Sequence, residues 1–137
     1  MTDHILNVSI VTPQSTAYEG SALAVSVPGS KSPFQVLFNH APIISSLDPG
    51  VLKVEDATNT ITYFASREGF IEVNKNVVSI VVQELVRAEE IDLDAAEAEV
   101  ASTRARAEAE PDRHARENAR RELHWAEAKM RAAKMVR

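Results

Sequence analysis

The composition of this 137-residue chain changes abruptly between Val86 and Arg87. Residues 1–86 hold all four glycines, five of the six prolines and 26 β-branched residues. Residues 87–137 hold no glycine, one proline, 4 β-branched residues and 14 alanines. Because β-branched side chains suit a pleated sheet, whereas alanine, glutamate and arginine favour helix, we expect an all-β part over 1–86 and an all-α part over 87–137.

The first part shows the alternation of apolar and polar residues that is typical of half-buried strands. Four apolar stripes carry this pattern: Leu6, Val8 and Ile10; Leu23, Val25 and Val27; Phe34, Val36 and Phe38; and Val78, Ile80 and Val82. Segments rich in proline, glycine and asparagine separate them and are typical of turns. Several short strands at this spacing predict a small β-sandwich or barrel.

The second part is predicted to form an antiparallel helical hairpin. We expect a helix at about 92–109, a turn near Pro111 and a helix at about 112–134, because proline disfavours helix at the residue before it and suits the first turn of a new helix. Each helix carries one apolar stripe with helical spacing: Leu93, Ala96, Val100, Thr103 and Ala107; and Ala119, Leu123, Ala126, Met130 and Ala133. Alanine buries little apolar area, so the hairpin should be loosely held, as a plain surface hairpin or a detachable arm.

Charge is segregated along this hairpin. Residues 88–112 carry nine acidic and two basic side chains, whereas residues 113–137 carry eight basic and three acidic ones. Antiparallel packing is therefore expected to place an acidic helix against a basic helix.

Several classes of function lose support from the composition. The net charge of −5 argues against nucleic-acid binding, which needs a basic surface. There is no cysteine, no apolar run near the roughly 20 residues of a membrane helix, and no export signal at the start. The four histidines lack metal-ligand spacing, and no phosphate loop or catalytic constellation is present, so we expect no metal, no cofactor and no independent catalysis.

Residues 34–52 read FQVLFNHAPIISSLDPGVL. This stretch resembles the signature of the epsilon subunit of rotary ATP synthases, which is roughly F-G-x-L-x-x-H-A-P-x-x-x-x-L-x-P-G. Other stretches agree with that family in order and spacing: residues 11–13 with 18–20, residues 25–28, residues 69–73, and residues 88–92 leading into the hairpin. The resemblance covers essentially the whole chain and agrees with the predicted sandwich and hairpin.

The resemblance implies a non-catalytic central-stalk subunit of the rotor. Such a subunit binds the gamma subunit and the ring of c subunits, and it couples the proton or sodium path to the catalytic head. In bacterial members, the hairpin can extend toward the catalytic beta and alpha subunits and block ATP hydrolysis. The implied location is peripheral, on the cytoplasmic face of the inner or thylakoid membrane and attached only through the complex, in a bacterial or organelle-encoded chain.

The same resemblance assigns a rotor contact to the loop formed by Phe38, Asn39, His40, Ala41 and Pro42, which would face the c ring. The sequence departs from the family pattern around this loop: Gln35 replaces the usual glycine, and Phe38 replaces a frequent proline. A turn histidine without any partner is the alternative interpretation of His40, and a core position is the alternative for Phe38.

The resemblance also suggests roles for the hairpin. Arg113, Arg116, Arg120 and Arg121 form a basic face that would contact an acidic loop of the catalytic beta subunit; the alternative is a solvated helix paired with its acidic neighbour. Some relatives bind ATP through a motif like Ile/Leu-Asp-x-x-Arg-Ala. Here Asp94 matches the aspartate, but Glu97 stands where the arginine should be. A carboxylate repels a triphosphate, so we expect weak or no ATP binding.

Two rival functions remain open at this stage. One is a stand-alone β-sandwich binding module in which the helices form a dimerisation arm. The other is a small enzyme whose site is not recognisable from sequence. A rotor subunit should co-purify with gamma, whereas a dimerising module should run alone at twice its mass.

Overall fold

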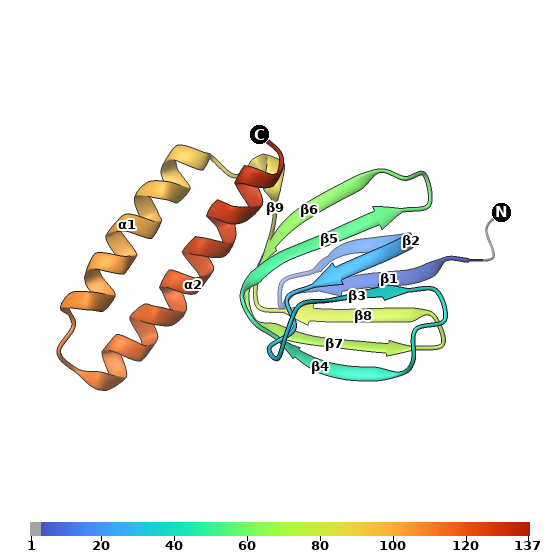
Figure 1. The fold of residues 1–137 in the computed structure, drawn as a ribbon, viewed down its shortest axis with the longest axis horizontal. Coiled ribbons are helices and arrows are strands. Elements are labelled where there is room, and N and C mark those ends of the chain that lie inside the picture. Colours follow the sequence, from blue (N-terminus) through green and yellow to red (C-terminus); the bar gives the residue numbers. More distant parts are fainter. Residues whose placement is uncertain (1–3) are drawn as a thin grey trace.

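The computed structural model describes residues 4–137; residues 1–3, part of the stretch in which no export signal is expected, lie outside the described residues. Within residues 4–137 there are nine strands, one short 3₁₀ helix and two α-helices (Figure 1). Their bounds are β1 (Leu6–Val11), β2 (Thr16–Val27), β3 (Phe34–Leu37), β4 (Ile43–Leu47), β5 (Gly50–Asp56), β6 (Ile61–Ser66), β7 (Gly69–Asn74), β8 (Val77–Val82), β9 (Leu85–Arg87), η1 (Ala88–Glu90), α1 (Leu93–Ala109) and α2 (Arg113–Met135). The expected class, an N-terminal β-sandwich followed by a C-terminal helical hairpin, is confirmed.

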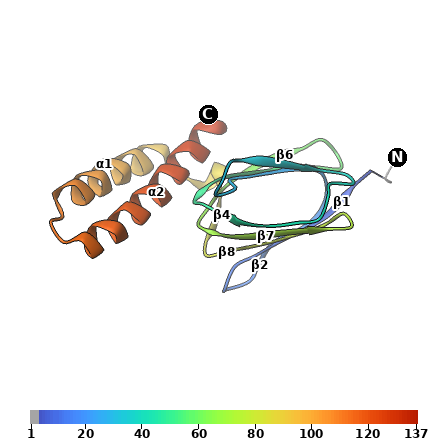
Figure 2. The same ribbon diagram turned by 60° about the horizontal axis from the view of Figure 1, so that its bottom comes forward.

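The sandwich is a single sheet folded over on itself. Its strand order is β4-β7-β8-β1-β2-β5-β6-β9, and β3 pairs with β2. The long strand β2 belongs to both layers, because its first half pairs with β1 and its second half pairs with β3 and β5. Figure 2 shows the two layers face to face. A register shift between Ala22 and Ala24 marks the point where β2 passes from one layer to the other.

The core of the sandwich follows most of the predicted stripes. Leu6, Val8 and Ile10 of β1 are buried, as are the three apolar residues predicted on β8. The stripe on β2 was predicted incorrectly at Leu23, which is only half-buried, because the bulge turns both Ala22 and Ala24 inward instead. The predicted stripe on β3 does not reach Phe38, because the strand ends at Leu37.

Each helix of the hairpin begins at an aspartate cap. The carboxylate of Asp92 accepts a hydrogen bond from the Ala95 amide at 3.3 Å, and that of Asp112 accepts one from the Ala115 amide at 2.9 Å. Pro111 precedes the second cap, so it lies in the turn between the two helices. Asp92 and Asp112 therefore have a structural role as helix caps.

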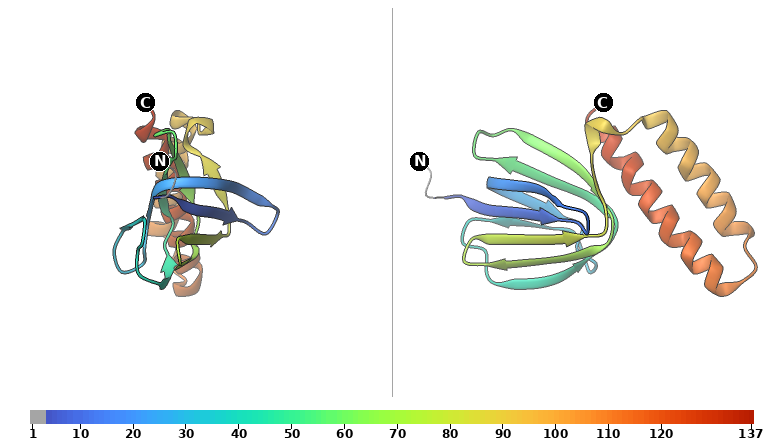
Figure 3. Two further views of the ribbon diagram at one scale, coloured as in Figure 1. Left: turned by 90° about the vertical axis from the view of Figure 1, so that its right-hand side faces the viewer. Right: turned by 180° about the vertical axis from the view of Figure 1, so that it is seen from behind.

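The helix α2 lies between α1 and one end of the sandwich (Figures 1 and 3). The predicted seam between the helices is confirmed: its alanines, Val100 and Thr103 are buried, and its leucines and Met130 are half-buried. A second face of α2 also buries Trp125, Ala128 and Ala132 against Ala65 and the neighbouring strands. Among the described residues, no helix is long and apolar enough to cross a membrane.

Candidate partner-binding surfaces

The loop of residues 38–42 lies at the end of the sandwich farthest from the hairpin, beside the β7–β8 turn (Figure 1). Asn39 and Asn76 hold these two segments together. The Asn39 amide donates to Oδ1 of Asn76 at 2.6 Å, and Nδ2 of Asn76 donates to Oδ1 of Asn39 at 3.2 Å. Both asparagines have left-handed backbone conformations, with φ of 64° and 66°, which asparagine tolerates better than most residues. The loop is therefore braced from a second turn.

The other residues of this loop present a mixed surface. Ala41 and Pro42 are exposed, whereas Phe38 and His40 are half-buried. The Phe38 ring packs edge-on against the His4 ring, with centroids 4.8 Å apart, so it is neither fully exposed nor a core residue. Since a carbonyl oxygen only accepts, Nδ1 of His40 must donate its hydrogen bond of 2.7 Å to the Ala41 carbonyl. This bond orients the imidazole and leaves Nε2 available to a partner.

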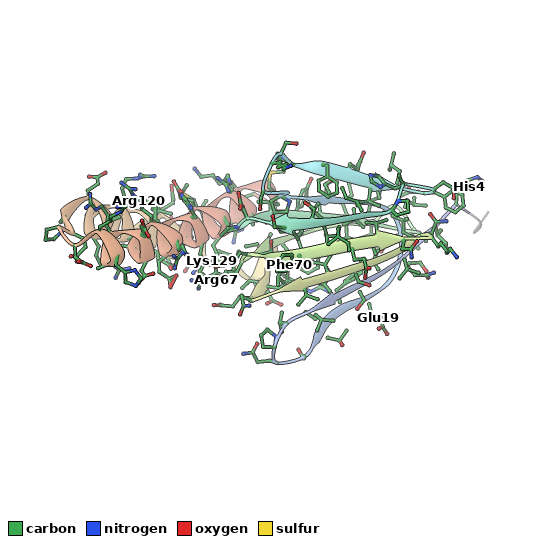
Figure 4. All side chains as sticks on the ribbon, turned by 90° about the horizontal axis from the view of Figure 1, so that it is seen from below. His4, Glu19, Arg67, Phe70, Arg120 and Lys129 are labelled. Atoms are coloured by element: carbon green, nitrogen blue, oxygen red, sulfur yellow. The ribbon has the colours of Figure 1, made fainter. Side chains whose placement is uncertain are left out.

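A second candidate surface lies on the outer face of the β4-β7-β8 layer. Phe70 and Val81 are directly opposite one another on β7 and β8, and their side chains are 62% and 54% exposed. Ile44 of β4, 74% exposed, is on the same face because its neighbour Glu72 also points outward. We call Ile44, Phe70 and Val81 the outer patch; Figure 4 labels Phe70 within it.

The outer patch was not predicted from the sequence. The available signal was the run of residues 77–82, VVSIVV, in which apolar residues occupy both faces of the strand. Alternation predicts the inward stripe of such a strand, but the outward residues then have no place in the core. Contiguous exposed apolar side chains on a sheet mark surfaces that bind other proteins.

The arginines expected to form a basic face do not act as one group. Arg116 and Arg120 line a cleft of about 360 Å³ between the helices, together with Arg104 and Glu108 of α1, so three basic side chains and one acidic side chain meet there. The sequence did not single out Arg104. Arg113 pairs with Glu117 at 3.6 Å, and Arg121 donates to Asn118 at 2.9 Å. Figure 4 shows Arg120 on the outer part of the hairpin, away from the sandwich. The structure thus brings Arg116 and Arg120 together with Arg104.

Contacts across the hairpin only partly follow the segregated charges. Lys129 of α2 binds Glu99 of α1 at 2.9 Å, in the expected direction. The other bridge is reversed, because Arg104 of α1 binds Glu127 of α2 at 3.0 Å. Asp94, the residue matched to a nucleotide motif, is exposed in the first turn of α1, and Glu97 is exposed one turn later. Weak or absent ATP binding there stays a prediction.

Arg67 attaches the sandwich to α2 by a polar contact, in addition to the packing of Trp125. Nη2 of Arg67 lies 2.7 Å from Oε2 of Glu122 on α2, and the same guanidinium lies 3.2 Å from both Glu68 and Glu84. Burial by itself would lower the pKa of Arg67, but the hydrogen bond to Glu122 and the neighbouring carboxylates raise it above its ordinary value. The expectation of a loosely held alanine seam therefore omitted two side chains that strengthen the attachment.

Among residues 4–137, no group of three or more histidine or acidic side chains is arranged to hold a metal ion. The described part of the chain instead presents a braced loop at one end, an apolar patch on one side and a basic cleft on the helical arm. Such an arrangement is typical of a subunit that works through its contacts with other proteins.

The fold and these surfaces define a class of protein, a β-sandwich with an appended helical hairpin and candidate surfaces for partner proteins. Residues 5–88 match the family model described as ATP synthase, Delta/Epsilon chain, beta-sandwich domain, and the chain belongs to this family. The ATP synthase epsilon chain of Thermosynechococcus vestitus is 31% identical over 132 residues, which cover 94% of this chain and 95% of that one. The epsilon chain of Leptospira borgpetersenii is 38% identical over 92 residues, covering 67% and 72%.

A solved structure has the same fold. A chain in the cryo-EM structure of Euglena gracilis mitochondrial ATP synthase, containing OSCP, F1 and the c-ring, superposes with a TM-score of 0.84. That comparison covers 95% of this chain and 81% of the other at 24% identity, so it supports the fold. The expectation that the chain resembles epsilon subunits of ATP synthases is confirmed.

Proposed function

We propose that the chain is a non-catalytic rotor subunit of ATP synthase that couples the c ring and the gamma subunit to the catalytic head. In this proposal the sandwich binds both rotor partners, and the hairpin contacts the catalytic beta and alpha subunits when it extends. The chain is attached to the cytoplasmic face of the membrane only through the complex. Family membership supports the assembly, and the three surfaces described above support the individual contacts.

The outer patch is the observation that carries this proposal. Exposing three large apolar side chains together on a sheet face costs free energy in water, and this free energy is regained when a partner protein covers them. The patch lies on the outer face of β4, β7 and β8, whereas the braced loop lies at the end of the sandwich (Figures 1 and 4), so the two surfaces can face different partners. We assign the outer patch to gamma and the loop of residues 38–42 to the c ring.

The basic cleft supports a contact with an acidic segment of the catalytic beta subunit. Arg120 is exposed, and within residues 4–137 Arg116 makes only a long hydrogen bond, 3.4 Å, to the Pro111 carbonyl. Guanidinium groups in this state retain donors for carboxylates, and such pairs are frequently bidentate. Extension of the hairpin toward the head would allow them to inhibit ATP hydrolysis.

Binding to gamma is tested with two single variants of the full chain. Phe70→Ser should weaken co-purification with gamma at least tenfold, because it removes the centre of the outer patch. Ile61→Ser is the matched control, since Ile61 is 44% exposed on β6, in the other layer. Equal binding by both variants and the wild type would contradict the assignment. A chain that runs alone at twice its mass and ignores gamma would favour the dimerising module.

Inhibition is tested by adding the chain back to an ATP synthase complex that lacks it. The double variant Arg116→Glu/Arg120→Glu should slow hydrolysis less than the wild type does. Arg106→Glu/Lys134→Glu changes the net charge equally at exposed positions of the hairpin outside the cleft, so it should inhibit as the wild type does. Full inhibition by the arginine double variant would refute the proposed contact while leaving the rotor assignment intact.

A further inference from the structure

One carboxylate, that of Glu72 on β7, lies among the apolar side chains of the outer patch. Glu72 is exposed and is directly opposite Ile44 of β4 and Ser79 of β8. Phe70, labelled in Figure 4, lies two residues before it on the same strand and the same face. Side chains opposite one another across a sheet have Cβ atoms about 4.5–5.5 Å apart. A partner that covers Ile44 and Phe70 therefore also covers Glu72.

The charge of Glu72 is not neutralised by the described part of the chain. Within residues 4–137, Glu72 forms no ion pair. The other outward-facing residues of β4, β7 and β8, all within the described chain, are uncharged: Ile44, Ser46, Phe70, Asn74, Val77, Ser79 and Val81. This face of the sheet thus carries one unpaired negative charge in a mainly apolar and neutral setting.

A hollow of about 360 Å³ opens beside this carboxylate. Residues 42–44 line it from the β4 side, and residues 72–74 line it from the β7 side. The exposed Pro42 and Ile44 make the first side apolar, whereas the second side supplies the Glu72 carboxylate and the Asn74 amide. We call this space the Glu72 hollow; it combines an apolar wall with two side chains that can accept hydrogen bonds.

A long basic side chain matches this composition. Lysine and arginine bury their methylene stems against apolar surface while the charged head keeps polar partners. In the Glu72 hollow, the stem would lie against Pro42 and Ile44, and the cation would form a charge-assisted hydrogen bond with Glu72. An apolar side chain in the same space would remove water from the carboxylate and offer no replacement, which is unfavourable for a charged group.

We propose that the partner covering the outer patch places a cationic side chain in the Glu72 hollow and pairs it with Glu72. This pairing rests on the proposed function, because it requires gamma to cover the patch, and it adds the chemistry of that contact. The apolar side chains supply affinity, and the ion pair supplies specificity, since a partner that lacks the cation leaves a buried carboxylate unpaired. Glu72 is therefore a specificity-determining residue of the contact with gamma.

The direction of the effect of Glu72→Gln tests the pairing, because the substitution removes the charge and keeps the size of the side chain. Surface plasmon resonance measures binding of the full chain to a complex of the catalytic head and gamma that lacks this subunit and the c ring. If gamma supplies the cation, Glu72→Gln should weaken binding roughly tenfold or more. If gamma supplies none, loss of an unpaired carboxylate should strengthen binding. Unchanged or tighter binding would overturn the proposal.

Glu19→Gln is the matched control for the change in charge. Glu19 is exposed on β2, which β1 separates from β8, and it lies outside the Glu72 hollow (Figure 4). This variant should bind as the wild type does. Equal weakening by the two substitutions would indicate a general attraction between an acidic chain and a basic partner, and it would refute a specific pair at Glu72.

Moving the carboxylate within the hollow tests the geometry. Asn74 lies two residues after Glu72 on the same face of β7, about 7 Å along the strand. The double variant Glu72→Gln/Asn74→Asp returns a charge to the hollow and should recover part of the lost binding. Glu72→Gln/Ser102→Asp adds the same charge at an exposed position of α1 and should recover none. No recovery with Asn74→Asp, or equal recovery with Ser102→Asp, would contradict the pairing.

Phe70→Ser separates failure of the ion pair from failure of the contact with gamma. Weaker binding by Phe70→Ser, combined with unchanged or tighter binding by Glu72→Gln, would refute the ion pair and leave the outer patch assigned to gamma. Unchanged binding by both variants would refute the ion pair and the assignment together. Circular dichroism and thermal melts of each variant establish that the fold is retained.

Discussion

Arg67 and Glu122 lie 55 residues apart in the sequence, and their side chains form an ion pair of 2.7 Å that joins the β6–β7 turn to the middle of α2. Among residues 4–137 it is the one ion pair between the sandwich and the helices α1 and α2. Arg67 also contacts Glu68 and Glu84, so it keeps two carboxylate partners when the hairpin leaves. The docked position is thereby stabilised modestly and reversibly.

Removal of this ion pair should loosen the hairpin without unfolding the sandwich. Glu122→Gln is expected to raise the hydrogen-exchange rate of α2 and to reduce its docking free energy by about 1 kcal/mol, since the pair is partly solvent-exposed. The effect should shrink as salt concentration rises. Glu117→Gln, which breaks an ion pair within α2, is the control. Equal exchange rates in the two variants would contradict a role of the Arg67–Glu122 pair in docking.

Trp125 should contribute more to docking than any alanine of the seam. The Trp125 side chain is 5% exposed and packs in a cluster with Ala65 and Ala88, while the Lys129 ammonium lies 5.1 Å from its ring centroid. Trp125→Ala is expected to cost about 3 kcal/mol, the usual scale for truncation of a buried large aromatic residue. Urea denaturation followed by far-UV circular dichroism measures this, with the half-buried Leu123→Ala as the control. A loss of unfolding free energy no larger than that caused by Leu123→Ala would show that the face of α2 around Trp125 is poorly packed.

The stability of the sandwich should fall at low pH partly through Asp56. Its carboxylate accepts from the Thr58 hydroxyl at 2.7 Å and from the Thr60 and Thr58 amides, and these bonds hold the pKa of Asp56 below its ordinary value of 3.8. Because the folded pKa is below the unfolded pKa, the contribution is complete above the unfolded value and is lost as pH falls through the folded one.

Asp56→Asn should therefore flatten the decline of thermal stability below about pH 4, where the carboxyl of the unfolded wild-type chain takes up protons before that of the folded chain. Thr58→Val removes one of the three donors and should give a smaller change in the same direction. The measurement is the melting temperature as a function of pH. An acid decline identical in Asp56→Asn and the wild type would show that this carboxylate is energetically unimportant.

Gly69 and Gly20 should respond oppositely to alanine. A Cβ on Gly69 would lie 1.9 Å from the Val81 carbonyl oxygen and 2.8 Å from Val82 Cα, so Gly69→Ala is expected to cost about 3 kcal/mol through displaced backbone. A Cβ on the exposed Gly20 has nothing closer than the Tyr18 hydroxyl at 3.5 Å, so Gly20→Ala should be neutral or slightly stabilising. Thermal melts compare the two variants, and equal melting temperatures would mean that β7 and β8 can move apart at little cost in free energy.

Much of the architecture was predictable because its causes are local. β-Branched alternation predicted the sandwich, and alanine with acidic and basic residues predicted the hairpin, since both patterns act within a few residues. The seam of the hairpin was predictable for the same reason. Leu23 was predicted incorrectly, because a bulge shifts the inward positions of a strand by one residue and leaves no clear mark in composition.

The candidate surfaces were less predictable. The loop of residues 38–42 was singled out by resemblance, but its brace by Asn76 depends on a turn 37 residues away. Arg116 and Arg120 were expected in a broader group, and their association with Arg104 follows from the register of two antiparallel helices. The outer patch could be predicted only from the order of the strands in the sheet, because that order decides whether the outward side chains of β7 and β8 are covered.

By itself the sequence determined which segments form strands or helices, where each helix is capped, and which stripe of each helix is apolar, because propensity, capping and periodicity are properties of neighbouring residues. Only the tertiary structure decided that Trp125 faces the sandwich, that Arg67 meets Glu122, and that Pro42 and Glu72 line one hollow. Those relationships depend on how whole elements pack over long sequence separations. Many pairings between the two parts satisfy the same local pattern, and close packing of the side chains selects one of them.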